Sequence, residues 1–144
     1  MATITLEQAD TIIEKAIEKR HELGLAPLTV AVLDPGGHLV AFKREDNSSL
    51  LRPQIAQGKA WGTLGMGISS RKVVDRFAAN TPFFTSLSML CEGQMLAIPG
   101  GLLIRDDHGD IAGAVGISGD SGENDEKCAI AGIEAAGISR HAHR

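Results

Sequence analysis

The sequence predicts an α+β protein in which helices pack on an antiparallel sheet of about five strands. Helix-like and strand-like segments follow one another in the order helix, two strands, two or three helices, about three strands, helix. The strands come as hairpins and a meander instead of alternating with single helices, a pattern that favours an antiparallel sheet. The length of 144 residues suits one domain, 1–144, in which we expect 138–144 to form a loose tail.

The first expected element is a helix that begins at Thr5. Thr5 and Gln8 have the T-x-x-Q spacing of a capping box, in which each side chain binds a free backbone N–H group of the other residue. Apolar residues then recur at helical spacing as far as Leu23. Gly24 supplies the left-handed residue that commonly ends a helix.

A hairpin and a glycine-containing helix are expected next. "LTVAVLD" is rich in β-branched residues, and the turn-forming "PGG" connects it to a second strand, "HLVAFKRE". The following helix begins near Pro53 and carries three glycines on nearly one face: Gly58, Gly62 and Gly65. Glycine weakens a helix, so the close approach of another backbone is a physical reason for these residues.

The remaining segments predict two short helices, three strands and a closing helix. "SSRKVVDRFAAN" and "PFFTSLSMLCE" carry the capping residues of short helices. The strand-like segments, the last two of them joined by a tight "HGD" turn, are "QMLAIP", "GLLIRDD" and "IAGAVGIS". The closing helix is "SGENDEKCAIAGIEAAG", capped by Asp120 or Ser121, with acidic residues in its first turn where the helix dipole favours them.

The glycine-rich stretch "AIPGGLLIRDDHGDIAGAVGISG" raises the question of a phosphate-binding loop. A dinucleotide site needs G-x-G-x-x-G between a strand and a helix. Here "GAVGISG" has the spacing G-x-x-G-x-x-G, and its first two glycines lie within the expected strand. We therefore expect these glycines to let another backbone or a flat ligand come close, and not to bind a nucleotide.

Composition and charge disfavour several classes of partner. The net charge of −4 argues against nucleic acid and anionic membranes, and the aromatic content of 3% without tyrosine argues against a base-stacking surface. No secretory leader or membrane-length apolar run is visible, so we expect a cytoplasmic protein. Cys91 and Cys128 form no C-x-x-C pair and are expected to be reduced, buried thiols.

Four blocks of the sequence carry a family resemblance. In chain order they are "VAVLDPGGHLVAFKRED", "QIAQGKAW", "IPGGLLIRDDHGDIAGAVGISG" and "ENDEKCAIAGI". Together they resemble the GlcG/HbpS-like family, which is also found as the C-terminal domain of PduO-type proteins. The resemblance covers essentially the whole chain, and the small stand-alone members that look most similar are encoded near genes of glycolate, glycerol or diol catabolism.

The resemblance implies a profilin-like α/β fold, which agrees with the antiparallel sheet expected above. It also implies homo-oligomers, either dimers or larger assemblies, and a small-molecule ligand. Some relatives bind haem, the family has been called haem-degrading or haem-binding, and PduO-like branches accompany cobalamin-dependent enzymes. Haem is therefore the cofactor that the resemblance implies.

His21 is the residue that the resemblance indicates as a ligand of the haem iron. It lies near the end of the first helix, where a histidine of haem-binding PduO-type relatives is thought to ligate iron. A neutral imidazole is a good axial ligand. The alternative is a helix-end histidine stabilised by the helix dipole. The chain has no C-x-x-C-H sequence, which excludes covalently attached haem.

Three cations near Pro53 are candidate cofactor-binding residues: Arg44, Arg52 and Lys59. Haem propionates, or any carboxylate ligand, need such cations, and arginine can bind a carboxylate in a bidentate manner. Arg44 could equally form a surface ion pair with Asp46.

The other polar and aromatic candidates each have a structural alternative. Trp61 and the pair Phe83–Phe84 could line a flat apolar pocket, but with so few aromatic residues core positions are the simpler expectation. The remaining histidines are expected to be solvated, turn-forming or weak adventitious metal ligands: His38, His108, His141 and His143. Aspartates near the strand ends could act as acids or bases, although acids beside hairpin turns more often form the turn: Asp34, Asp106 and Asp107.

Three functions remain open at this point. The first is an oligomeric accessory protein that binds haem or another flat or carboxylated small molecule. The second is a small enzyme acting on a hydroxy-acid, aldehyde or diol-pathway intermediate, although no serine elbow, H-E-x-x-H or Cys–His arrangement identifies a mechanism, which favours a protein that is not an enzyme. The third is a structural partner in a catabolic complex, with the helix around Gly58–Gly65 as its interface.

Overall fold

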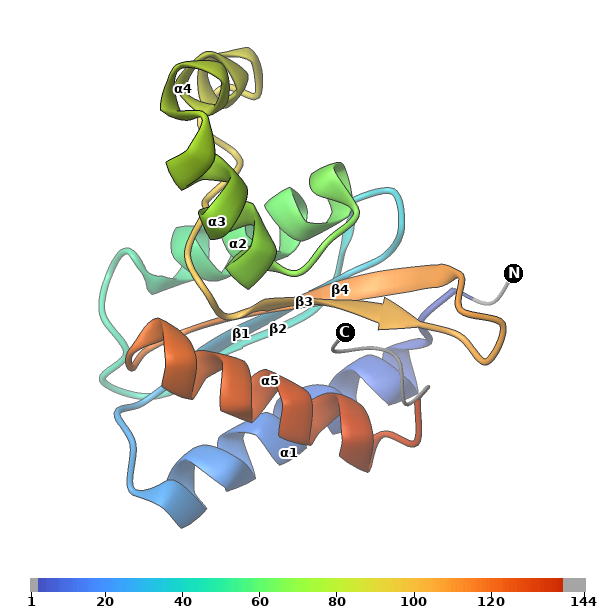
Figure 1. Ribbon diagram of the computed structural model, residues 1–144. Helices are drawn as coiled ribbons and strands as arrows, with labels where there is room; N and C mark the ends of the chain where they lie inside the picture. Colours follow the sequence, from blue (N-terminus) through green and yellow to red (C-terminus); the bar gives the residue numbers. More distant parts are fainter. Residues whose placement is uncertain (1–2, 139–144) are drawn as a thin grey trace.

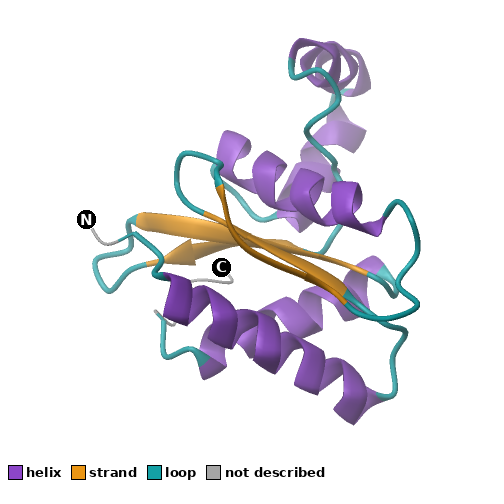
Figure 2. Ribbon diagram, turned by 180° about the vertical axis from the view of Figure 1, so that it is seen from behind, coloured by secondary structure: helices purple, strands orange, loops and turns teal. Residues whose placement is uncertain are grey.

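The computed structural model describes residues 3–138, which contain five helices and four strands. In chain order these elements are α1 (Leu6–Leu23), β1 (Thr29–Leu33), β2 (Leu39–Arg44), α2 (Arg52–Met66), α3 (Ser70–Ala79), α4 (Thr81–Leu90), β3 (Gly101–Arg105), β4 (Ile111–Ser118) and α5 (Gly122–Ala135). The sheet forms a middle layer, with α2 packed on one face and α1 and α5 on the other (Figure 1). α3 and α4 rise away from the sheet beyond α2, and the view from behind shows the same layers (Figure 2).

The helix ends follow the local signals in the sequence. Thr5 and Gln8 form the expected capping box at the start of α1, and Gly24 ends the helix with a φ of 66°. Ser121 caps α5, because its hydroxyl accepts a hydrogen bond from the backbone N–H of Asn124 at 3.1 Å. These caps confirm the boundaries that the sequence predicts for the first and last helices.

The sheet is antiparallel throughout and has the strand order β2-β1-β4-β3. This confirms the α+β class but corrects the strand number, which is four and not about five. The segment 94–99, expected as a strand, runs over α2 instead. The backbone N–H of Leu96 donates to the carbonyl of Gly58 at 3.2 Å, and Met95 packs between α3 and α4. A backbone N–H group of this segment is therefore hydrogen-bonded to a helix and not to a neighbouring strand.

The two faces of the sheet differ in the size of their cores. The larger core lies between the sheet and the pair α1 and α5, and includes Ile12, Val30, Val115, Ile117 and Ile133. The core under α2 is small. Small residues on both surfaces bring α2 and the sheet close together, so little space remains for large side chains.

Gly116 shows why the glycine-rich stretch is needed. It lies in β4 directly beneath α2, and a Cβ at this position would collide with the carbonyl oxygen of Ala56 and the backbone nitrogen of Ala60. Gly58 and Gly62 play a similar part on the other side of α2, where Leu96 passes close to them. The expectation of close backbone approach is confirmed for these glycines, and they form no loop around a ligand.

Candidate functional site

A groove of about 580 Å³ lies where the last turn of α1 meets the end of β2. It brings His21 and Arg44 together, two of the residues that the sequence predicts for a site. The rest of its lining includes apolar surface from Ile17 and Pro27, two further cations, Arg20 and Lys43, and the acidic residues Glu45 and Asp46. The groove therefore combines an imidazole and apolar walls with side chains of both charges.

Glu45 holds the imidazole end of this groove in place. One oxygen of its carboxylate accepts hydrogen bonds from the backbone N–H of Leu28 at 2.6 Å and from Nε of Arg20 at 3.0 Å. The other oxygen lies 3.3 Å from Nε2 of His21. The Glu45 side chain is 12% exposed whereas that of His21 is 61% exposed, so a largely buried carboxylate anchors a histidine that faces solvent.

Both ring nitrogens of His21 have a polar neighbour. Nη1 of Arg20 lies 3.2 Å from Nδ1 of the imidazole. A guanidinium can only donate hydrogen bonds, so a hydrogen bond at this position requires the tautomer in which Nδ1 accepts and Nε2 donates to Glu45. An unprotonated ring nitrogen is the atom that ligates metals. One of the two contacts has to open before a ring nitrogen can take an iron atom.

Arg44 and Arg52 lie in different places, and only Arg44 is in the groove. Arg44 is exposed, and its Nη1 donates to the carbonyl of Ser48 at 2.9 Å. Arg52 begins α2 and donates to the hydroxyls of Ser118 at 3.0 Å and Ser49 at 3.2 Å. Only Arg44 lines the groove with His21, whereas Arg52 braces the start of α2 against β4.

Lys59, the third cation that the sequence suggests for a carboxylate ligand, lies inside the protein. Its side chain is 2% exposed, and its ammonium donates to the carbonyl of Ile117 at 2.7 Å and to Asp125 at 3.1 Å. Burial lowers the pKa of Lys59, an effect that the carboxylate of Asp125 opposes. The ammonium has internal partners, so we do not extend the anion-binding proposal to Lys59.

The two aspartates at the starts of the hairpin turns have matching structural roles. Asp34 accepts hydrogen bonds from the backbone N–H groups of Gly36 and His38, and Asp106 accepts them from His108 and Asp110. The N–H of His38 in particular lowers the pKa of Asp34. These contacts support turn formation as their role.

The other sequence candidates lie apart from the groove. The His38 ring is 80% exposed and sits 3.1 Å from Asp34, and His141 and His143 lie outside the described residues. Phe84 is buried as expected, whereas Phe83 is 54% exposed. Both cysteines are free, but only Cys128 is buried and Cys91 is half-buried.

Some of the residues that shape the groove were missed by sequence reasoning. Glu45 lies in the first of the family blocks and Arg20 directly precedes His21, but neither signal indicates that the two side chains meet. Within residues 3–138, no group of three or more His, Cys, Asp or Glu side chains is placed to hold a metal ion. A haem iron needs fewer protein ligands, since the porphyrin supplies four.

Within the same residues no helix is long and apolar enough to cross a membrane.

Comparison with known protein families identifies the family of this chain. Residues 4–134 match the family model described as haem degrading protein HbpS-like. The chain belongs to the HbpS-like family. The match extends over nearly the whole described chain and confirms the resemblance carried by the sequence blocks.

Members of this family and solved structures resemble the chain along most of its length. The chain is 27% identical over 126 residues to the corrinoid adenosyltransferase PduO of Salmonella typhimurium, but it spans only 37% of that protein. It is 26% identical to an uncharacterized 15.0 kDa protein from the dhaT-dhaS intergenic region of Citrobacter freundii, covering 93% of this chain and 92% of that one.

Two solved structures share the fold. The structure of a PduOC:Heme complex superposes with a TM-score of 0.86 at 23% identity, covering 99% of this chain and all of the other. The structure of HbpS gives a TM-score of 0.80 at 24% identity, covering 93% of this chain and 90% of that one. At these identities the likeness establishes the architecture.

Proposed function

We propose that this HbpS-like protein is a haem-binding accessory protein, with the groove at the end of α1 as the haem site and His21 as the iron ligand. The observation that carries the proposal is the position of His21, whose largely exposed imidazole shares one groove with Lys43 and Arg44. The family match and the haem complex of a structural relative support the same ligand.

The residues of the groove fit the chemistry of haem. An axial ligand requires an imidazole, the porphyrin requires apolar surface, and the propionates require cations, for which arginine is well suited. His21, Ile17 with Pro27, and Lys43 with Arg44 supply these three features. When bound, haem would supply a redox-active iron centre to the protein.

The contacts of Glu45 allow the imidazole of His21 to turn away from it toward a ligand. If the imidazole turns outward, the Glu45 carboxylate keeps the backbone N–H of Leu28 and the guanidinium of Arg20 as partners. A buried carboxylate left without partners would be costly, but here only one of its contacts is exchanged. The site can therefore release its histidine without leaving a buried charge unpaired.

Hemin titration of the purified protein tests the proposal. We expect a shifted Soret band in the wild type, its loss or strong weakening in His21→Ala, and its retention in His38→Ala. His38 is a matched control because it too is an exposed histidine beside a carboxylate, in its case that of Asp34. Arg44→Gln is expected to weaken binding roughly three- to ten-fold, since one charge-assisted contact is lost.

Two results would overturn different parts of the proposal. If wild-type protein binds hemin no differently from an unrelated acidic protein, the haem function is wrong. If hemin binds specifically but His21→Ala binds as the wild type does, the ligand assignment is wrong while haem binding stands.

Self-association is part of the same proposal. α4 stands away from the sheet, and its side chains Phe83, Met89 and Leu90 are 54%, 77% and 80% exposed. Exposed apolar side chains of this size favour burial against another protein surface. We propose a homo-oligomer of 1–144 as a single domain, and measurement of the mass in solution tests it, since a strict monomer would contradict it.

A further inference from the structure

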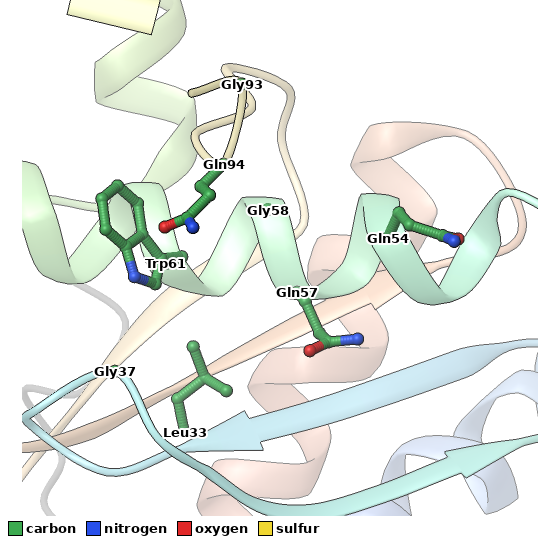
Figure 3. A pocket seen from close by; sticks show the side chains of 8 residues that line it. All are labelled: Leu33, Gly37, Gln54, Gln57, Gly58, Trp61, Gly93 and Gln94. Carbon is green, nitrogen blue, oxygen red and sulfur yellow. The ribbon is translucent and has the colours of Figure 1, made fainter. Parts of the chain in front are cut away.

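A second pocket, of about 430 Å³, lies on the α2 side of the sheet (Figure 3). Leu33 forms part of its floor, at the end of β1 opposite to Thr29, which pairs with Arg44. The pocket and the haem groove therefore lie on different faces and at opposite ends of the sheet. Its volume falls within the range of about 300–1,000 Å³ that is typical of small-molecule sites.

The polar groups of this pocket have unused hydrogen-bonding capacity. Within residues 3–138, neither the indole N–H of Trp61 nor the side-chain amide of Gln94 has a hydrogen-bond partner. Gln57 makes one long contact, from Nε2 to the carbonyl of Pro53 at 3.3 Å, which leaves its amide oxygen available.

The view into the pocket shows how these groups are arranged. Gln94 extends from its loop beside the ring of Trp61, whereas Gln57 points from α2 toward the strand below (Figure 3). Gln54 also lines the pocket, but its side chain points away from the Trp61 end (Figure 3). Gln57 and Gln94 thus line one pocket from two elements, with an aromatic ring beside Gln94.

The charge of the lining decides the class of ligand. Among the described residues, the lining contains glutamine amides, an indole, a leucine and glycine backbone, and no acidic or basic side chain. An anionic ligand would lose hydration here without gaining a cation, which is unfavourable. A hydroxyl group both donates and accepts, as does an amide, so neutral hydroxylated molecules match this lining.

We propose that this pocket binds a small neutral polyhydroxylated molecule, a sugar or polyol, with its C–H face against Trp61 and its hydroxyls on Gln57 and Gln94. Trp61 offers an apolar ring with a polar N–H at its edge, which suits a ligand that is apolar on one face and hydroxylated at its rim. The single aromatic ring offers stacking on one side only, which favours a sugar over a planar base held between two rings.

Intrinsic fluorescence provides a direct test. Trp61 is the only tryptophan of the 144 residues and the chain has no tyrosine, so the emission of the wild type reports on this pocket. The probes are glucose, myo-inositol and glycerol, compared with the anionic gluconate and glucose 6-phosphate and the nucleoside uridine. N-acetyltryptophanamide in the same solutions controls for solvent effects on emission.

We expect a saturable change in emission with at least one neutral polyol and weaker or no change with its anionic counterpart. Gln57→Leu and Gln94→Leu are each expected to weaken binding roughly three- to ten-fold, because each removes hydrogen bonds of a neutral ligand. Gln54→Leu, at a lining residue of the same helix whose side chain points away from Trp61, is expected to weaken binding less than either of these variants.

Several outcomes would overturn the proposal. These are no saturable change with any of the three polyols, binding of gluconate or glucose 6-phosphate as tight as that of glucose, binding of uridine alone, or an equal effect of all three leucine substitutions. His21→Ala is expected to leave polyol binding unchanged, so failure of the haem proposal and failure of this one are separable.

Discussion

Nζ of Lys59 and Oδ2 of Asp125 lie 3.1 Å apart in the interior of the protein. Lys59 comes from α2 on one side of the sheet and Asp125 from the first turns of α5 on the other. Each charge has a second partner, since the ammonium also donates to the carbonyl of Ile117 and the second carboxylate oxygen accepts from the backbone N–H of Asp120 at 2.9 Å. Burial raises the pKa of Asp125, and the ammonium of Lys59 opposes this shift. The pair joins the two outer layers at the end of β4.

Removal of one member of this pair should be strongly destabilising. We expect Lys59→Met to lower the free energy of unfolding by about 3–5 kcal/mol, because Asp125 would remain as an unpaired buried charge. Urea denaturation followed by circular dichroism measures the change. The double variant Lys59→Met with Asp125→Leu is the control and should recover much of the loss. An unfolding midpoint of Lys59→Met equal to that of the wild type would contradict the structural role of the pair.

Two glycines should respond to alanine in opposite directions. Gly116→Ala places a methyl group against the backbone of Ala56 and is expected to destabilise the protein by about 1–3 kcal/mol or more. Gly65, near the end of α2, is exposed and has nothing within 4 Å of a Cβ, so Gly65→Ala is expected to stabilise by about 0.5–1 kcal/mol. Thermal unfolding of both variants checks the signs, and equal shifts would be inconsistent with close packing of α2 on β4.

The two thiols should differ in reactivity. Cys128 is fully buried, and burial raises its pKa to about 11, whereas Cys91 is half-buried in the turn after α4. The thiolate is the reactive form, so we expect a thiol reagent such as DTNB to modify Cys91 in the native protein and Cys128 only after denaturation. Two thiols reacting at the same rate without denaturant would show that α5 does not seal Cys128.

Asp120 should contribute to the acid dependence of stability. The backbone N–H of Ala26 at 3.0 Å lowers the pKa of Asp120, helped by the amide of Asn124 and the N–H of Ser121. At pH values between the lowered native pKa and the unfolded pKa, the native state therefore binds fewer protons than the unfolded state. The contribution is therefore present above the unfolded value of about 3.9 and is lost as the pH falls through the lower native value.

The variant Asp120→Asn isolates this effect. We expect the difference in unfolding free energy between wild type and Asp120→Asn to be constant near neutral pH and to shrink below about pH 4. Denaturation series at several pH values measure it. A difference that stays the same down to pH values well below that point would show that the carboxylate is not stabilised by these donors.

The sequence predicted more of the fold than of the candidate sites. The capping box of α1, the serine cap of α5 and the two hairpins were confirmed, and His21 and Arg44 do line one groove. The expected fifth strand was wrong because the segment 94–99 finds its backbone partner on α2, and no local pattern distinguishes that from pairing with a strand. Lys59 carries no sign in the sequence that its charge is buried.

The sequence by itself determined the helices, the turns and the family, because caps and turns depend on residues only two to four positions apart. The tertiary structure alone decided which polar groups meet. Lys59 and Asp125 are 66 residues apart in the chain, and Arg20 and Glu45 are 25 apart. Gln57 and Gln94 share a pocket only because the loop after α4 returns across α2. These contacts between distant residues depend on how closely the layers pack, and the small residues between α2 and β4 allow that close packing.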